Sequence, residues 1–249
     1  MNQSSYISPE AIIHSGATIH PGVWIGPGVT VCGGATVSPG AVLGLPSPGQ
    51  ITRPTVLEAN VHLGPGVYVE GGVHIEADAQ VGFGSYIRQG SRIGRRVRIA
   101  HRCSIMGDCQ IEHDARLLAE VYVCEDALLR AHCQLMPGVK LLNDPYPPTA
   151  LQVAGPVIGE CAIIGANAII WPGVKVGYHA MVSSSSDVRR DVEDYIVVRG
   201  NPAEPLCDVR RIRMKLGDKW VFPYPWMRHR IDGDDITKML LDPDAAIHP

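Results

Sequence analysis

The sequence predicts an all-β solenoid, a chain wound into stacked coils of short parallel strands, and three observations lead to this fold class. First, an aliphatic residue recurs at every sixth position through most of the chain, a period that fits neither an α-helix nor a β-hairpin. Second, a small or compact residue follows four positions after each aliphatic one. Third, Gly, Pro, Asn and Asp stand between them and favour tight corners. Three short strands per coil would stack the aliphatic residues into one core.

The aliphatic positions form three blocks, each with a constant frame. The blocks run from Ile7 to Leu43, from Leu57 to Leu141 and from Ile158 to Val188. Three of the seven cysteines occupy the small position of the repeat, where a thiol packs as a compact apolar residue; they are Cys103, Cys109 and Cys133. The odd number of cysteines and the lack of CxxC spacing argue against a disulfide framework and against a zinc ribbon.

The composition is that of an ordinary soluble protein, with 249 residues, a formal net charge of −3, 45% hydrophobic residues and 6% aromatic residues. Basic residues gather only in RQGSRIGRRVRIAHR, from Arg88 to Arg102, where they are interleaved with the repeat. We interpret them as a solvated or ligand-facing row, and we expect no nucleic-acid partner. No signal-like segment and no run of about 18 apolar residues is present, so we expect a cytoplasmic protein without a membrane span.

The frame breaks twice, and each break predicts a loop extruded from the solenoid. The register slips by two residues in a loop at 44–56 and by five residues in a loop at 142–156. A solenoid has no concave pocket of its own, so extruded loops are the natural places to build one. The second loop presents an amide and a carboxylate, Asn143 and Asp144, before a Pro-Tyr-Pro-Pro run that stiffens the backbone.

After Val188 the repeat ends, and we divide the chain into a β-helix domain at 1–204 and a tail at 205–249. Apolar residues three or four apart predict an amphipathic helix over 205–217 that ends at Gly217. These residues are Leu206, Val209, Ile212 and Leu216. We expect the aromatic stretch WVFPYPWM to pack on the last coil or on a neighbouring subunit. A last short helix is expected from Asp234 or Asp235 through Leu241.

Over roughly residues 5–203, this repeat resembles that of the hexapeptide-repeat acyltransferases. The resemblance implies a left-handed parallel β-helix and a homotrimer; the hand comes from the family, because a sequence period cannot show it. The loop sequence NDPYPP resembles the Asn-Asp-x-Tyr-Pro loop of enzymes that N-acetylate nucleotide-linked amino sugars. The stretch VIGECAIIGANAIIWPGVKVGYHAMVSSSSDV and the closing VVRGNPA resemble the coenzyme A half of the same enzymes.

The resemblance therefore implies an acetyl-CoA-dependent N-acetyltransferase of amino sugars, in which the acetyl group passes directly from the thioester to an amine. In this scheme Asn143 holds the sugar or the developing oxyanion, and Asp144 orients the amine or accepts its proton. Tyr146 of the same loop is a candidate substrate contact. Backbone amides of the last coils would hold the pantetheine, and two arginines suit its phosphates. These coenzyme A candidates are Gly165, Ala166, Ser183, Ser184, Arg190 and Arg199.

Three histidines are rival candidates. His101, in RIAHRCSI, resembles the IAH element that carries the general base of the lipid A hexapeptide acyltransferases, although Arg102 stands where those enzymes have Asp. His113 is a further candidate base, and His132 a candidate substrate contact. The alternative activity is thus an O-acyltransferase that uses a carrier-bound acyl chain, with His101 as base. The alternative outside enzymes is a catalytically silent scaffold or binding protein.

A metal site is an alternative, because γ-class carbonic anhydrases share the predicted fold and bind zinc between subunits through three histidines. Their pair of histidines separated by five residues is absent. His101, His113 and His132 lie 12 and 19 residues apart. We therefore expect no metal.

Overall fold

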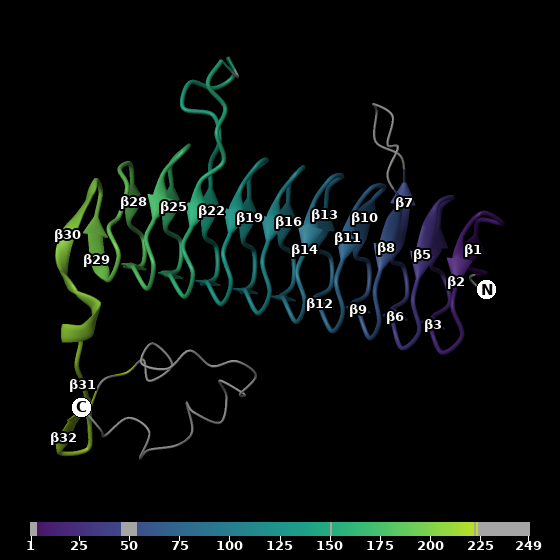
Figure 1. Ribbon diagram of the computed structural model, residues 1–249, viewed down its shortest axis with the longest axis horizontal. Coiled ribbons are helices and arrows are strands. Elements are labelled where there is room, and N and C mark those ends of the chain that lie inside the picture. Colours follow the sequence, from purple (N-terminus) through teal and green to yellow (C-terminus); the bar gives the residue numbers. More distant parts are fainter. Residues whose placement is uncertain (1–3, 46–53, 150, 222, 224–249) are drawn as a thin grey trace.

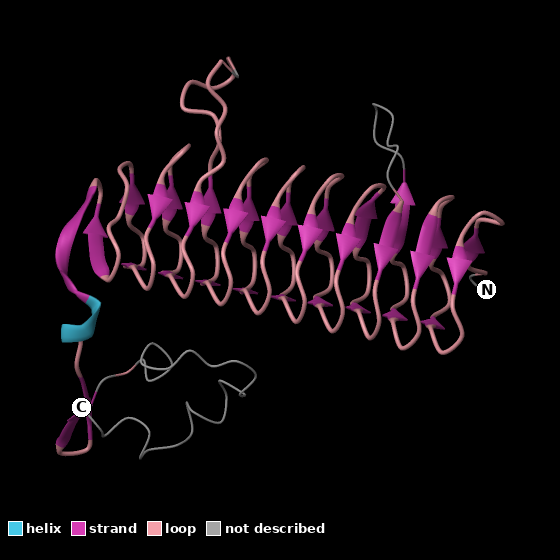
Figure 2. Cartoon of the chain, in the orientation of Figure 1, coloured by secondary structure: helices cyan, strands magenta, loops and turns pink. Residues whose placement is uncertain are grey.

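The computed structural model describes residues 4–45, 54–149, 151–221 and 223, and it shows an elongated solenoid with three parallel sheets (Figure 1). Most strands have two or three residues, and within the coils they pair in parallel with the strand one coil further on, as Tyr6 does with Trp24. Helix is almost absent from the described residues (Figure 2). The all-β solenoid is confirmed, and its form is consistent with the left-handed parallel β-helix.

From β1 to β28, the strands distribute over the three sheets in strict rotation. Sheet A contains β1 (Tyr6–Ile7), β4 (Trp24–Ile25), β7 (Val42–Leu45), β10 (Tyr68–Glu70), β13 (Tyr86–Ile87), β16 (Ser104–Ile105), β19 (Tyr122–Val123), β22 (Lys140–Leu141), β25 (Ile169–Ile170) and β28 (Asp187–Val188). Sheet B contains β2 (Ile12–Ile13), β5 (Val29–Val31), β8 (Thr55–Leu57), β11 (His74–Ile75), β14 (Arg92–Ile93), β17 (Gln110–Ile111), β20 (Leu128–Leu129), β23 (Val157–Ile158) and β26 (Lys175–Val176). Sheet C contains β3 (Thr18–Ile19), β6 (Thr36–Val37), β9 (His62–Leu63), β12 (Gln80–Val81), β15 (Arg98–Ile99), β18 (Arg116–Leu117), β21 (Gln134–Leu135), β24 (Ile163–Ile164), β27 (Met181–Val182), β29 (Ile196–Gly200) and β30 (Ala203–Asp208).

Three rows of turns join the sheets, and we call them the AB edge, the BC edge and the CA edge after the sheets that each row connects in chain order. A typical turn contains one residue with a positive φ angle, such as Gly28, Asn60 or Asp78. Gly, Asn and Asp adopt this left-handed conformation at the lowest cost, which explains why they recur at the corners.

The core is the stack of aliphatic residues that the period predicts. Ile25, Leu63 and Ile105, for example, have no exposed surface. Packing of the cysteines at the small positions is confirmed, since Cys103, Cys109 and Cys133 are all buried. Burial raises the pKa of the Cys109 thiol to about 12.

Both frame breaks occur at the AB edge. The first loop joins β7 to β8, and most of it lies outside the described residues. The second loop joins β22 to β23 and projects far from the solenoid (Figure 1). Between the two loops, sheet A runs without interruption through β10, β13, β16 and β19.

The predicted helix over 205–217 is wrong. β30 instead pairs antiparallel with β29 at the end of sheet C, followed by the 3-10 helix η1 (Val209–Arg211) and a hairpin of β31 (Met214–Leu216) and β32 (Lys219–Val221). The segment forms a strand because it pairs with the free edge of β29. In this strand Leu206 is 52% exposed. Gly217, with a φ of 58°, lies in the hairpin turn and ends no helix.

Other expectations for the tail remain predictions. β30 crosses residue 204, and the division of the chain into two domains there stays a prediction. Most of the aromatic stretch, and the helix expected from Asp234 or Asp235 through Leu241, lie outside the described residues.

None of the helical segments that the structure describes has both the length and the apolar character that a membrane crossing requires.

Candidate functional site

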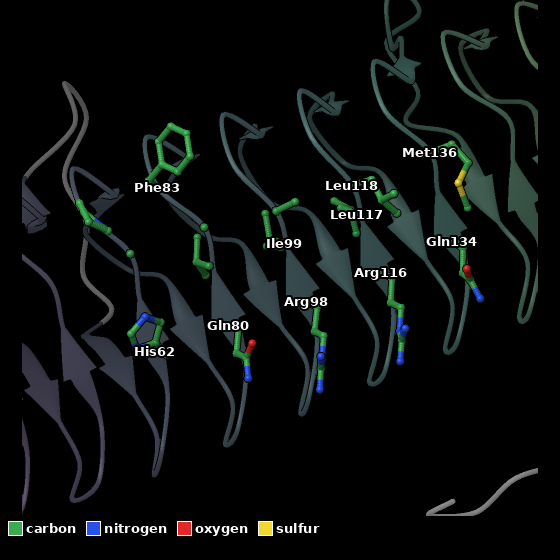
Figure 3. Close-up of a pocket in the computed structure, with 15 residues that line it drawn as sticks. His62, Gln80, Phe83, Arg98, Ile99, Arg116, Leu117, Leu118, Gln134 and Met136 are labelled. Atoms are coloured by element: carbon green, nitrogen blue, oxygen red, sulfur yellow. The ribbon is translucent and has the colours of Figure 1, made fainter. Parts of the chain in front are cut away.

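A groove of about 630 Å³ follows the outer face of sheet C beside the CA edge (Figure 3). Its polar side is a ladder with one side chain from each of five strands in register, one coil apart. The ladder consists of His62, Gln80, Arg98, Arg116 and Gln134. Its apolar side comes from the CA edge and includes Phe83, Leu118 and Met136. The ladder faces outward because side chains alternate along a strand and the next residue enters the core.

His101 lies on the CA edge, next to the groove-lining residue Ala100. Its ring stacks on that of Phe83, with ring centroids 4.9 Å apart and an interplanar angle of 3°. Phe83 is 49% exposed, and His101 is half-buried. Within the described part of the chain, the ring nitrogens of His101 have no hydrogen-bond partner. Stacking on Phe83 therefore holds the imidazole ring in place, while the ring nitrogens remain available to a substrate.

Most of the predicted coenzyme A residues lie on the same CA edge as His101. Ala166 and Ser184 occupy turns three and four coils further along this edge, at distances of about 14 Å and 19 Å for the usual spacing of paired strands. Arg199 follows on β29, next to Ser183, whose amide donates to the carbonyl of Val198 at 2.9 Å. Arg190 does not join them, because it follows β28 at the AB edge.

The backbone amides in this group differ in their availability. The amide of Gly165 donates to the carbonyl of Val182 at 2.8 Å, and the amide of Ser183 is also used between coils. These two amides therefore cannot hold pantetheine as the sequence suggested, because inter-coil hydrogen bonds already occupy them. The amides of Ala166 and Ser184 make no hydrogen bond to any residue that the structure describes, so they remain free.

The 142–156 loop is organised by its own hydrogen bonds. Asp144 accepts a hydrogen bond from the amide of Tyr146 at 2.8 Å, and Thr149 donates from its hydroxyl to the Tyr146 carbonyl at 2.6 Å. The carbonyl of Asn143 accepts from the amide of Ala154 at 2.9 Å, which closes the base of the loop. Asn143 and Asp144 are half-buried, whereas Tyr146 is 63% exposed. One carboxylate oxygen of Asp144 thus serves the turn itself.

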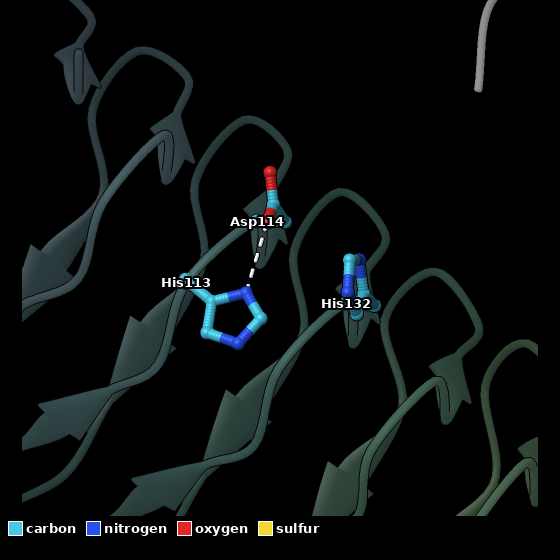
Figure 4. Close-up of side chains that lie close together, drawn as sticks. All are labelled: His113, Asp114 and His132. Carbon is cyan, nitrogen blue, oxygen red and sulfur yellow. Dashed lines mark hydrogen bonds and ion pairs between the residues drawn. The ribbon is translucent and has the colours of Figure 1, made fainter. Parts of the chain in front are cut away.

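His113 and His132 form a separate cluster with Asp114 at the BC edge (Figure 4). His113 Nδ1 lies 2.9 Å from Asp114 Oδ2, and the two imidazole rings meet edge to face with centroids 5.2 Å apart. Partial burial, which outweighs the attraction of Asp114, lowers the pKa of His132. Burial acts to raise the pKa of Asp114, but hydrogen bonds from Arg96 and His113 hold it below its usual value.

The ligand atoms of this cluster lie within 4.8 Å of one another, a spacing that a metal ion could bridge after small movements. Arg96 counts against a cation here, because its Nε and Nη2 donate to both oxygens of Asp114 at 2.8 Å and 2.6 Å. The absence of a metal stays a prediction.

The predicted catalytic residues and the candidate substrate contact His132 therefore lie on three different edges of one chain. His101 lies on the CA edge, His113 and His132 lie on the BC edge, and Asn143 and Asp144 lie on the AB edge. The sheets between the edges keep these groups apart, so a single subunit does not combine them in one site.

Comparisons with known proteins agree with the repeat. A family model described as bacterial transferase hexapeptide (six repeats) matches residues 54–89, and one described as hexapeptide repeat of succinyl-transferase matches residues 157–184. A chloramphenicol acetyltransferase of Klebsiella aerogenes is 47% identical over 58 residues, which are 23% of this chain and 28% of the relative. A 2,3,4,5-tetrahydropyridine-2,6-dicarboxylate N-acetyltransferase of Ligilactobacillus salivarius is 41% identical over 66 residues, 26% of this chain and 27% of the relative.

Among solved structures, a UDP-N-acetylglucosamine acyltransferase aligns with 23% identity and a TM-score of 0.45, over 80% of this chain and 70% of that one. The matches to these two curated relatives cover less than a third of their length. The two family models and the acetyltransferase relatives support the predicted resemblance to the hexapeptide-repeat acyltransferases.

Sequence reasoning missed the groove residues Phe83 and Arg116, and it included Arg98 only within the basic row from Arg88 to Arg102 that was interpreted as solvated or ligand-facing. A signal for the two arginines was present, because the residues immediately before the aliphatic positions, taken at intervals of one coil, read Gln80, Arg98, Arg116 and Gln134. Phe83 has no comparable signal, because its contact with His101 depends on how neighbouring turns stack.

Proposed function

We propose that this protein transfers an acetyl group from acetyl-CoA to the amine of a nucleotide-linked amino sugar. The names of the relatives support acetyl transfer, and the NDPYPP loop supports the amino sugar. The observation that carries the proposal is the shared CA edge. It aligns His101 and the sheet C groove with the free amides of Ala166 and Ser184, inside the segment that matches the succinyl-transferase repeat.

The donor would lie along the CA edge. The guanidinium of Arg199 is exposed at the end of this edge and suits the phosphates of coenzyme A. The free amides of Ala166 and Ser184 then meet the amide groups of the pantetheine arm. This direction brings the thioester toward His101 and leaves the sheet C groove to the acceptor.

The chemistry requires a neutral amine, a donor for the tetrahedral oxyanion and a departing thiolate. His101 takes the proton of the attacking amine, since its ring nitrogens have no partner among the described residues. Asn143 holds the sugar or the oxyanion, and Asp144 orients the amine. Because a thiolate leaves readily, orientation supplies much of the rate.

These groups meet only if two chains contribute, because His101 and Asn143 lie on different edges. We place the CA edge and groove of one subunit against the 142–156 loop of the next in a homotrimer, the assembly that the family resemblance implies. Each trimer then has three equivalent sites.

The proposal predicts acetyl-CoA binding and the loss of acetyl transfer in two variants. Coenzyme A and acetyl-CoA should raise the melting temperature, because a ligand that binds only the folded state stabilises it. With a nucleotide-linked amino sugar as acceptor, thiol release from acetyl-CoA should fall by about 10²- to 10⁴-fold in His101→Ala and Asn143→Ala. His14→Ala, at an exposed turn far from the groove, is the control and should keep full activity. Binding of neither coenzyme A species, or full activity in both variants, would exclude the proposed reaction.

A second function is favoured by one observation, the position of His101 at the rim of the groove. A hydroxyl acceptor needs a base more than an amine does, so His101 also suits O-acyl transfer from a carrier-bound chain. Activity on a sugar hydroxyl that is lost in His101→Ala and kept in Asn143→Ala would identify this reaction.

A further inference from the structure

Two arginines lie side by side on neighbouring strands inside the sheet C groove. Arg98 on β15 pairs with Arg116 on β18 in parallel register, and both side chains point the same way from the sheet (Figure 3). The backbones of paired strands are about 4.8 Å apart, so two positive charges lie side by side. Like charges directly opposite in a sheet are destabilising.

Neither guanidinium has a partner among the residues that the structure describes. No hydrogen bond or ion pair joins Arg98 or Arg116 to a carboxylate there. Other arginines of the same coils are paired with a carboxylate on a neighbouring coil. These pairs include Arg92 with Glu76 at 2.7 Å, Arg96 with Asp114 at 2.6 Å, and Arg102 with Glu120.

The surroundings of the pair suit a polyanion that is attached to a larger group. Gln80 and Gln134 continue the ladder on either side and offer neutral amides that both donate and accept. Phe83, on the opposite wall, is 49% exposed and provides an apolar surface. The groove therefore combines a compact positive centre with uncharged polar and apolar flanks.

We infer that Arg98 and Arg116 bind the diphosphate group of a substrate in the sheet C groove, one guanidinium to each phosphate. Guanidinium groups bind phosphate oxygens through two parallel hydrogen bonds, and a diphosphate neutralises both charges at once. The inference rests on the proposed function, because that function supplies the two substrates that carry a diphosphate. These are the nucleotide-linked acceptor and coenzyme A. With the donor phosphates at Arg199, the diphosphate in the groove belongs to the acceptor.

Isothermal titration calorimetry on the full-length protein tests this directly. The probes are inorganic pyrophosphate, uridine diphosphate, coenzyme A and pantetheine, titrated into the wild type, Arg98→Gln and Arg116→Gln. Loss of a charge-assisted hydrogen bond should weaken diphosphate binding by about tenfold or more in each variant. Arg116→Lys, which keeps the charge, should lose less. Arg92→Gln is the control, because it removes an exposed, paired arginine of sheet B and should leave every affinity unchanged.

The outcomes identify the source of the diphosphate. Weaker binding of pyrophosphate and uridine diphosphate with unchanged coenzyme A supports the acceptor as the source. Weaker binding of coenzyme A with unchanged pantetheine supports a diphosphate site that is used by the donor. Pyrophosphate and nucleotide affinities that are equal in all variants, or no binding in the wild type, would overturn the inference.

The inference and the proposed function can fail separately. If Arg116→Gln binds diphosphate as well as the wild type while the wild type acetylates amino sugars, only the inference fails. If the arginine variants lose diphosphate binding and no amine is acetylated, the diphosphate site stands and the proposed reaction fails.

Discussion

At the scale of single residues, His179 shows how burial sets a pH dependence. Its side chain is 3% exposed, and its Nδ1 has no hydrogen-bond partner among the described residues. The ring stacks on Tyr195 with centroids 5.4 Å apart, and Arg210 covers that tyrosine at 4.5 Å. Burial lowers the pKa of His179 from 6.5 to about 4, because the charged imidazolium loses its hydration.

A depressed histidine pKa predicts that stability falls in acid. The unfolded chain takes up the proton as the pH falls below 6.5, whereas the folded protein resists it until the pH approaches the pKa of about 4. The free energy of unfolding should therefore drop by about 2 kcal/mol between pH 7 and pH 4.5 through this residue. Urea unfolding at several pH values measures the drop, and His179→Phe, which keeps the ring, should remove it. An equal drop in the variant and the wild type would contradict this assignment.

Residue type and spacing predicted the buried positions more accurately than they predicted the candidate functional positions. Cys103, Cys109 and Cys133 are in the core because the six-residue period assigns them an inward-facing position. The role of His101 depends on Phe83, a residue one coil away, and the period carries no information about which ring stacks on which. Whether a backbone amide is available likewise depends on pairing between coils, and the amides of Gly165 and Ser183 are already used in such pairs.

At the scale of one element, the turns of the CA edge depend on how closely successive coils approach. A Cβ atom added to Gly165 would lie 2.4 Å from the amide nitrogen of Ser184 and 2.7 Å from the carbonyl carbon of Ser183. Both neighbours are backbone atoms, so no side-chain rotation relieves the contact. The glycine is required because the next coil passes directly over it.

Gly165→Ala should consequently destabilise the protein by about 1 to 3 kcal/mol, the usual cost of overpacking. Gly107→Ala is the matched control, because the nearest atom to its added Cβ, the carbonyl oxygen of Gln89, is 3.4 Å away. Urea midpoints of the two variants measure the difference. Equal midpoints would show that the coils adjust freely, contrary to the close packing described here.

The elements also show where a sequence pattern stops being sufficient. The aliphatic period predicted both loops and the extent of the solenoid, because one inward position recurs in every strand. Over 205–217 the same kind of apolar pattern predicted a helix, but the open edge of β29 pairs with β30 instead. A pattern of apolar residues does not fix the backbone conformation of a segment by itself, because a free strand edge nearby can pair with that segment instead.

At the scale of the whole molecule, the predicted site residues are distributed over different edges of the solenoid. The CA edge holds His101, the groove and the free amides, while the AB edge holds the Asn143 loop. One subunit cannot bring both to the same substrate, so our account requires that neighbouring chains share each site. A closed threefold assembly satisfies this requirement with identical contacts between all subunits.

Subunit complementation tests this central claim most directly. His101→Ala and Asn143→Ala, each inactive alone, are unfolded together in equal amounts, refolded and assayed for acetyl transfer. If each site takes His101 from one chain and Asn143 from the next, about a quarter of the sites in randomly mixed trimers are intact, and about a quarter of the wild-type activity should return. Each variant refolded alone is the control. No activity in the mixture, with trimers formed, would contradict the shared site.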